Sequence, residues 1–197
     1  TSGTKGKRYI TPNARVLFDT VDLHYLRERR AAELAGDAAA MRAAMRTRDL
    51  ELALIHEADA TLVVSEVERA LLAIDATGAD VRVLSNLHRE TPPGPAWSQR
   101  DGLLFVGGFR HPPNVDAVLW FAREVLPRIR AVRPTLEFHC VGGDVPNEIA
   151  RLAELPGIRI HGHVPDLQPL LDGARVSIAP LRYGAGVKGK VNQAMAH

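Results

Sequence analysis

The sequence predicts an α/β fold in which parallel strands alternate with crossover helices. Three observations lead to this prediction. Short apolar runs recur along the 197 residues, helix-like stretches separate several of them, and one proline-rich segment interrupts the alternation near the middle of the chain. The predicted strands are Arg15–Phe18, Thr61–Ser65, Val81–Ser85, Leu103–Gly108, Leu136–Gly143, Ile158–Gly162 and Arg175–Pro180.

Three segments between these strands have helical character. Asp22–Ala35 and Asp37–Ala58 predict helices, the second of them long, alanine-rich and amphipathic. Asn114–Arg133 predicts a third, with Asn114 as its N-cap. Pro127 predicts a bend in it, because proline removes one backbone hydrogen bond. The apolar stripe of this helix consists of Val115, Val118, Leu119, Ala122, Val125, Leu126 and Ile129.

The segment HRETPPGPAWSQRD, residues 88–101, holds three prolines and a glycine and predicts a linker. It separates one α/β unit, residues 1–87, from a second, residues 102–197. Neither is expected to be complete, because the first has few parallel strands and the second stops within a helix. We therefore expect a fragment of a longer protein.

Composition sets limits on compartment and class. The chain is 46% hydrophobic, lacks an apolar run of the roughly 18 residues that a membrane span needs, and begins without the apolar core of a secretory signal, so we expect a cytoplasmic protein. A net charge of +2 without an aromatic-interleaved basic face argues against nucleic-acid binding. Cys140, the single cysteine, lies in an apolar run and is expected to be a buried strand residue.

Two glycine-rich loops follow predicted strands, at the edge where parallel sheets bind ligands. VGGFRHPPN carries Gly107, Gly108 and Arg110, and YGAGVKGK carries two of the four lysines in the chain. A diphosphate needs closely approaching backbone amides, cations and a helix N-terminus, and both loops supply them. The alternatives are a tight turn for the first loop and a flexible surface connection for the second. The second loop would contribute Gly184, Gly186, Lys188, Lys190 and the start of a helix at Val191.

Other ligand motifs fit less well. No lysine of the second loop is followed by Ser or Thr, which disfavours a magnesium-dependent P-loop, and no Gly-x-Gly-x-x-Gly opens the first strand–helix unit of the chain. His161 and His163 would point to one side of a strand, but no third zinc ligand has a recognisable spacing. We expect no bound metal and no cofactor.

Several segments together resemble the group 1, retaining glycosyltransferases of the GT-B architecture, in which two Rossmann-like domains face each other across a cleft. ADATLVVSEVERALL and VRVLSN are similar to the end of their N-terminal, acceptor-side domain. LLFVGGFRHPPNVDAVLWF, LEFHCVGG, IRIHGHVPDLQPLL and VSIAPLRYGAGVKGKVNQAMAH are similar to successive units of their nucleotide-sugar-binding domain. The resemblance covers most of the chain from about Arg15.

The resemblance implies a set of donor-binding residues. Arg110 and Lys188 or Lys190 would hold the diphosphate, and Gly107 and Gly108 would let the backbone approach it. Members of the family usually carry two glutamates with seven residues between them, and here the aligned positions hold Ala185 and Gln193. It also implies that His163 and Val164 border the base, that Gln193 lies near the ribose, and that no metal is required.

In the first unit, FDTVDLHYLRERR follows a strand and places Asp22 and His24 at its end. The resemblance implies that this edge faces sugar and acceptor, so both residues are candidates for catalytic contact with the transferred sugar. Capping of the next helix is the alternative role for Asp22.

The resemblance implies a hexosyl-transferring glycosyltransferase that moves a sugar from a nucleotide-diphosphate donor to a glycan or lipid-linked acceptor, in cell-surface polysaccharide synthesis. The full-length protein would act in the cytoplasm or at the inner face of the membrane, and this chain by itself would be inactive. Two other functions stay open: a non-catalytic nucleotide-sugar-binding module, and an epimerase of the same architecture that acts on the donor alone.

Overall fold

The computed structural model describes residues 13–87, 92 and 94–196. These residues form two compact units, which are described separately. The first holds the described residues up to Leu87 together with Tyr183–Val187. The second holds the described residues between Leu87 and Tyr183 together with those from Lys188 onward. The sequence-based boundary instead places all of 102–197 in one domain. Residues 1–12 and 197 lie outside the description, as do residues 88–91 and 93 of the predicted linker.

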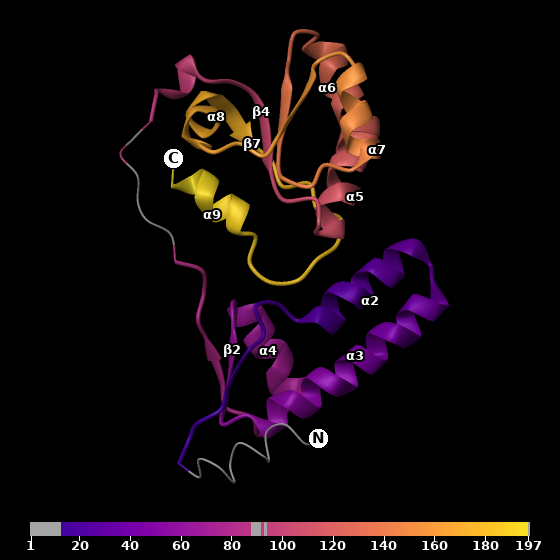
Figure 1. The fold of residues 1–197 in the computed structure, drawn as a ribbon, viewed down its shortest axis with the longest axis vertical. Helices are drawn as coiled ribbons and strands as arrows, with labels where there is room; N and C mark the ends of the chain where they lie inside the picture. Colours follow the sequence, from indigo (N-terminus) through magenta and orange to yellow (C-terminus); the bar gives the residue numbers. More distant parts are fainter. Residues whose placement is uncertain (1–12, 88–91, 93, 197) are drawn as a thin grey trace. The chain divides into compact units, whose positions relative to one another are not determined.

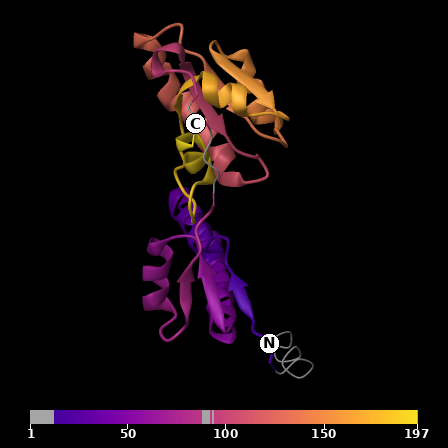
Figure 2. The same ribbon diagram turned by 90° about the vertical axis from the view of Figure 1, so that its left-hand side faces the viewer.

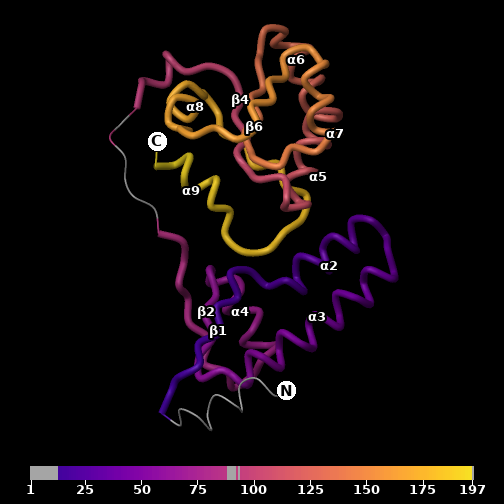
Figure 3. The backbone as a smooth tube through the Cα atoms, viewed as in Figure 1, coloured from indigo at the N-terminus to yellow at the C-terminus, as the bar shows by residue number. Residues whose placement is uncertain are grey.

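The first unit is a parallel three-stranded sheet with the strand order β1-β2-β3. Figure 3 traces β1 and β2 alongside each other, and Figures 1 and 2 show α2 and α3 as a helical hairpin. Its elements are β1 (Leu17–Asp19), α2 (His24–Ala35), α3 (Ala38–Glu57), β2 (Ala60–Val63), α4 (Glu66–Asp75) and β3 (Val81–Val83).

Local sequence signals explain where these helices begin and end. Gly36 ends α2 in the left-handed conformation, with φ of 65°, which glycine adopts without steric cost. Asp37 then caps α3, because its carboxylate accepts hydrogen bonds from the amides of Ala39 and Ala40. Ser65 caps α4 by accepting from the amide of Glu68. The predicted helices over 22–35 and 37–58 are therefore confirmed to within two residues.

The second unit is a four-stranded parallel sheet with the order β6-β5-β4-β7. Helices α5 to α7 lie on one side of it, and α8 and α9 lie on the other (Figure 1). Its elements are η1 (Trp97–Gln99), β4 (Asp101–Val106), α5 (Pro112–Trp120), η2 (Phe121–Val125), α6 (Leu126–Val132), β5 (Phe138–Val141), α7 (Asn147–Ala150), η3 (Arg151–Glu154), β6 (Ile158–Gly162), α8 (Gln168–Gly173), β7 (Ala174–Ser177) and α9 (Gly189–Met195).

The predicted helix over 114–133 forms, but its start and its middle differ from expectation. It begins at Pro112 after an N-cap at His111, so Asn114 is not the cap. Its middle, Phe121–Val125, is a π-helical turn. Helix α6 then begins at Leu126, with Pro127 as its second residue. The wider turn accommodates a proline that cannot donate a backbone hydrogen bond, which is the interruption that Pro127 predicts.

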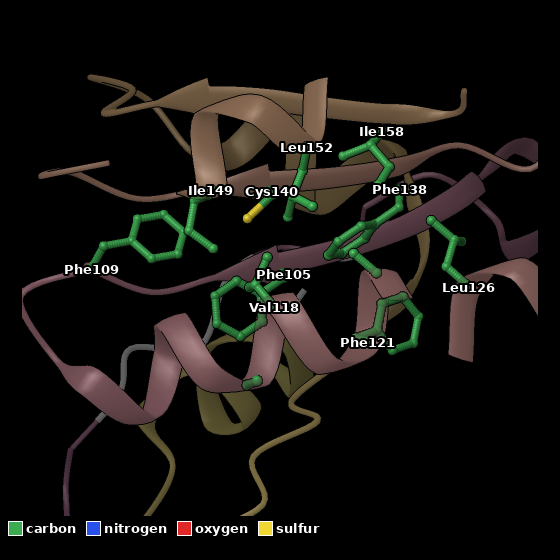
Figure 4. Close-up of a cluster of buried hydrophobic side chains, with 12 residues drawn as sticks. Phe105, Phe109, Val118, Phe121, Leu126, Phe138, Cys140, Ile149, Leu152 and Ile158 are labelled. Atoms are coloured by element: carbon green, nitrogen blue, oxygen red, sulfur yellow. The ribbon is translucent and has the colours of Figure 1, made fainter. Parts of the chain in front are cut away.

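The core of the second unit lies mainly between the sheet and α5, η2, α6 and α7 (Figure 4). Alternate residues of β4 and β5 point into it, including Phe105, Phe138 and Cys140, each fully buried. The burial of Cys140 confirms the expectation that it is a structural strand residue. The opposite face packs Leu104 and Val141 against Leu171 of α8.

Candidate functional site

The loops after β4 and β5 stay joined beyond the end of the sheet. The amide of Gly107 donates to the carbonyl of Val141 at 2.9 Å, and the amide of Phe109 donates to that of Gly143 at 3.0 Å. A Cβ atom at Gly142 would lie 2.1 Å from the Gly107 carbonyl oxygen, which only glycine avoids. This carboxyl edge is therefore built by close backbone approach.

Lys190 reaches this edge from α9. Its Nζ donates to Oδ1 of Asn114 at 2.6 Å, and Nδ2 of Asn114 donates to the carbonyl of Gly108 at 2.7 Å. Nζ also lies 4.2 Å from the centre of the Phe105 ring, and 2.8 Å from where a Cβ atom at Gly107 would stand. The structure thus brings Lys190, Gly107 and Gly108 together. Asn114 links them and is 6% exposed.

Burial lowers the pKa of Lys190 to about 8, and the positive charge of Lys188 adds to this effect. The ammonium is therefore held where water solvates it poorly. An anion that arrived beside it would restore a favourable environment for the charge. Such a site can bind a phosphate group through charge-assisted hydrogen bonds.

Lys190 also lines a hollow of about 320 Å³ between β7 and α9, with Ser177, Ile178 and Ala179 on the strand side. Ligand sites of proteins start at about this volume. Gln193 stands one turn after Lys190 on α9 and is half-buried. Residues three apart on a helix lie on adjacent parts of one face, so Gln193 accompanies Lys190.

Lys188 occupies the N-cap position of α9 and is half-buried, and the helix begins at Gly189 rather than at the predicted Val191. Its side chain makes no capping hydrogen bond. Of the two lysines in the motif, Lys190 is the one that the structure places at the glycine turn.

Arg110 follows the same turn, but its side chain has its own partner. Its Nε lies 3.0 Å from the carboxylate of Asp144, and its side chain is 86% exposed. Asp144 adopts a left-handed backbone with φ of 57° directly after the β5 glycines, a conformation that aspartate tolerates. Asp144 is a site residue that was not predicted, although an aspartate after Gly-Gly at a strand end signals such a turn.

His163 and Val164 follow β6, which ends at Gly162 with φ of 67°. Val164 packs against the cluster around Leu104, and His163 is exposed. The Cβ atom of His163 lies 4.0 Å from the position that a Cβ atom at Gly143 would take, so this loop borders the loop after β5.

Gly184 and Gly186 lie elsewhere, in the first unit, and differ from the expectation of amides exposed for a ligand. The amide of Gly186 donates to Oε1 of Glu68 at 3.1 Å, and the carbonyl of Gly184 accepts from Arg30. Ala185 between them is part of the buried core. Gly186 serves packing, because a side chain there would meet the Cβ atom of Asp22 at 3.0 Å.

Asp22 and His24 stand at the carboxyl end of β1. His24 lies between two carboxylates: its Nε2 is 3.6 Å from Asp22, and its Nδ1 is 3.2 Å from Glu51. Asp22 also binds Arg27. The turn before them is strained, because Val21 has a φ of 58°, which is rare for a β-branched residue.

Asp22 is not the cap of α2. The N-cap position is Leu23, whose side chain cannot accept a hydrogen bond. Buried glutamates from other helices accept from the first amides of α2 instead. Glu51 of α3 accepts from the amides of His24 and Tyr25 at 3.1 and 2.8 Å, and Glu68 lies 3.4 Å from the amide of Leu23. Neither glutamate was predicted for this role, since a glutamate inside a helix usually faces solvent.

His161 pairs with His139 of the neighbouring strand, and the two ring nitrogens lie 2.9 Å apart. Burial is the largest cause that lowers the pKa of His161, followed by the charges of His139 and Arg159. Among the residues that the structure describes, no group of three histidine, cysteine or carboxylate side chains is arranged to hold a metal ion. Within the same residues, no helix is both long and apolar enough to cross a membrane.

Comparisons with known proteins bear on the family and the fold of the chain. Residues 100–197 match the family model described as "Glycosyl transferases group 1". No curated protein sequence matches the chain closely enough to serve as a relative.

Solved proteins that share the fold include TarM and sucrose-phosphate synthase. A structure of Staphylococcus aureus TarM, a mutant in complex with Fondaparinux, alpha-GlcNAc-glycerol and UDP, is 15% identical, with a TM-score of 0.64 over 77% of this chain and 31% of that chain. Sucrose-phosphate synthase from Thermosynechococcus elongatus is 16% identical, with a TM-score of 0.63 over 97% of this chain and 50% of that chain. The chain thus spans about a third to a half of the length of these proteins.

Proposed function

The chain belongs, through residues 100–197, to the group 1 glycosyl transferases of the GT-B fold, and we propose that it takes part in moving a sugar from a nucleoside diphosphate donor to an acceptor hydroxyl. The observation that carries the proposal is the ammonium of Lys190, which lies at the Gly107–Gly108 turn through Asn114. A cation held at the carboxyl edge of a parallel sheet suits a diphosphate.

In this proposal Lys190 contacts the diphosphate, and Lys188 and Arg110 add positive charge around it. The charge of the diphosphate rises as the bond to the sugar breaks, so pre-placed cations stabilise the transition state more than the bound donor. Gln193, beside Lys190 on α9, has both a donor and an acceptor for a ribose hydroxyl. His163 and Val164 border the base.

Asp22 and His24 would serve the sugar and acceptor side. The contacts of His24 with Asp22 and Glu51 hold its ring in one orientation, which a group that handles a hydroxyl proton requires. We propose a hexose as the transferred sugar and a glycan as the acceptor. The TarM complex, which holds UDP and a glycerol-linked GlcNAc, supports that choice of substrates.

Calorimetric titration with UDP, GDP and ADP tests the donor half of the proposal. We expect one of the three to bind, and Lys190→Ala to weaken that binding by at least about tenfold, since it removes a charge-assisted contact. Lys188→Ala and Arg110→Ala should have smaller effects. Arg128→Ala, an exposed change on α6, is the control. Unchanged affinity in Lys190→Ala would refute the assigned role.

One observation favours a non-catalytic donor-binding module as the second candidate. Ala185, where the family resemblance predicts a glutamate, is 9% exposed within the core of the first unit and leaves no carboxylate at that position. This candidate predicts nucleoside diphosphate binding but no hydrolysis or transfer of the sugar. Turnover assays of the full-length protein separate the two candidates.

A further inference from the structure

Another hollow of the second unit lies at the amino edge of the sheet, the edge opposite to the Gly107–Gly108 turn. It has a volume of about 380 Å³ and lies between η1, the start of β4, the turn after α6 and the start of β7. Three arginines line it, Arg100, Arg133 and Arg175, against a single carboxylate, Asp101. The hollow is therefore positively charged.

Arg175 is held in place with part of its guanidinium unused. Its Nε donates to the carbonyl of Arg100 at 2.6 Å, and its Cζ lies 4.5 Å from the centre of the Trp97 ring. Within the described residues, no carboxylate pairs with its two terminal amino groups. A guanidinium fixed in this way loses little conformational entropy when it binds an anion.

Arg133 lies on a turn that hydrogen bonds hold in place, and its guanidinium forms no ion pair with a described residue. The amide of Leu136 donates to its carbonyl at 3.1 Å, and Arg130 braces the same turn by donating to the carbonyl of Leu136. No described carboxylate lies within ion-pair distance of the Arg133 side chain. The turn thus presents a second guanidinium to the hollow without a competing acid.

The third arginine contributes less. Arg100 donates from Nε to the carbonyl of Pro95 at 2.9 Å and from Nη1 to that of Leu171 at 3.5 Å, so its side chain holds the wall of the hollow. Asp101 accepts from the amide of Gly102 at 2.8 Å and is the one negative group of the lining. Arg133 and Arg175 outweigh it.

The rest of the surroundings suits a sugar. Trp97 is not among the residues that line the hollow, but it lies beside it, against Arg175, and is 67% exposed. Arg175 stacks on part of its indole ring, and the remaining ring surface gives the apolar face of a pyranose a flat surface to pack on. Ser98, Gln99 and Thr135 line the hollow with two hydroxyl groups and an amide, which can exchange hydrogen bonds with sugar hydroxyls. Two forked cations next to these groups match a carboxylate or phosphate on that sugar.

We propose that this hollow binds an anionic saccharide, a sugar or short glycan that carries a carboxylate or a phosphate. Arg133 and Arg175 take the anionic group, and Trp97 takes the sugar ring. Arg100 and Arg175 also line the hollow beside Lys190, whereas Arg133, Ser98, Gln99 and Thr135 line this one alone. The proposal does not depend on sugar transfer.

Calorimetry of the 197-residue chain with three probes tests this proposal: a trigalacturonate, its methyl ester, and glucose 6-phosphate, with inorganic phosphate alone for reference. We expect the trigalacturonate or the glucose 6-phosphate to bind at least about tenfold more tightly than the neutral ester and than phosphate. The stronger of the two anionic probes identifies the source of the charge.

Variants locate the site. Arg133→Ala and Trp97→Ala change exposed side chains and should each weaken binding by about fivefold or more, and Asp101→Asn should strengthen it because it removes the repelling carboxylate. Arg151→Ala, an exposed change on η3, should change nothing. Equal binding of the methyl ester, equal binding of a short polyglutamate, or unchanged affinity in Arg133→Ala and Trp97→Ala would overturn the proposal.

Discussion

Lys190 combines a partly buried ammonium with a hydrogen bond to Asn114, and its environment makes stability depend on pH. Its pKa falls from 10.5 to about 8 on folding, chiefly through burial. Between these pH values the unfolded chain binds the proton and the folded chain does not, so stability rises with pH across that window. Below pH 8 both states are charged, and the full cost of burying the charge remains.

We therefore expect Lys190→Met to stabilise the second unit at pH 7 by about 1 kcal/mol, because methionine fills similar volume without a buried charge. The advantage should shrink as the pH approaches 10. Denaturant unfolding of both proteins from pH 7 to 10 measures it. A constant difference between them would show that the ammonium is not the cause.

The same titration predicts how donor binding depends on pH. Above pH 8 the free protein loses the Lys190 proton, and a diphosphate must then bring one back, so affinity for the bound nucleotide should fall as the pH rises through 8. Titrations with UDP at pH 7, 8 and 9 measure this fall. Lys188→Ala serves as the comparison and should keep it, whereas Lys190→Met should remove it.

Cys140 shows the opposite effect of burial on a group that is neutral at pH 7. Burial raises the pKa of its thiol to about 12, although the charge of Lys190 opposes the shift. We expect iodoacetamide to leave Cys140 unmodified in the folded chain and to modify it in denaturant, as mass spectrometry can record. Rapid modification of the native chain would indicate that β5 opens locally.

At the scale of elements, the start of α2 depends on carboxylates from two other helices. Glu51→Ala removes the acceptor for the amides of His24 and Tyr25, and it should destabilise the first unit by about 2 kcal/mol. Asp22→Ala should cost less, since Asp22 does not cap the helix. Thermal unfolding followed by circular dichroism tests this order, and the reverse order would restore Asp22 as the cap.

The strained turn between β1 and α2 offers a gain in stability instead. Val21 has a left-handed backbone and a side chain that is 69% exposed, so Val21→Gly should relieve strain without losing buried area. We expect a net gain of about 0.5–1 kcal/mol after the entropy that glycine adds to the unfolded chain. Val21→Asn, which tolerates the same backbone, should gain part of it, and Val21→Ala should gain little.

At the scale of the whole chain, residues far apart in sequence complete each unit. Tyr183–Val187 belong to the first unit, where Gly186 binds Glu68 and Ala185 enters the core. A chain that ends at Arg182 should therefore show faster amide hydrogen exchange in α2 and α4. Glu68→Gln in the full chain should reproduce part of the effect. Unchanged exchange in the shortened chain would mean that the segment adds nothing to this unit.

Local sequence patterns predicted most of the elements. Seven strands were expected and seven form among the described residues, and β6 has the predicted bounds of Ile158–Gly162. The expected ends of β4 and β5 reached two residues too far, because glycines that leave the sheet look like part of an apolar run. The π-helical turn before Pro127 and the N-cap of α5 at His111 could not be predicted from local sequence patterns either.

The candidate site was also predicted only in part. The glycine and lysine motifs marked the right segments, but nothing in them distinguished Lys190 from Lys188, or the glycines near Lys190 from those that pack against Glu68. Asn114 lies 76 residues from Lys190, and Glu51 lies 26 and 27 residues from Tyr25 and His24. Asp144, the partner of Arg110, follows an ordinary strand end. The spacing of residues along the chain does not predict such long-range contacts.

By itself the sequence determined the alternation of strand and helix, the parallel sheets and the loops that carry cations, because these follow from periodicity, turn residues and helix caps within a few neighbours. Only the tertiary structure decided which lysine reaches the glycine turn, which glutamates start α2, and which glycine amides are already bonded. Those outcomes depend on burial and on contacts between distant segments, and folding alone brings these segments together.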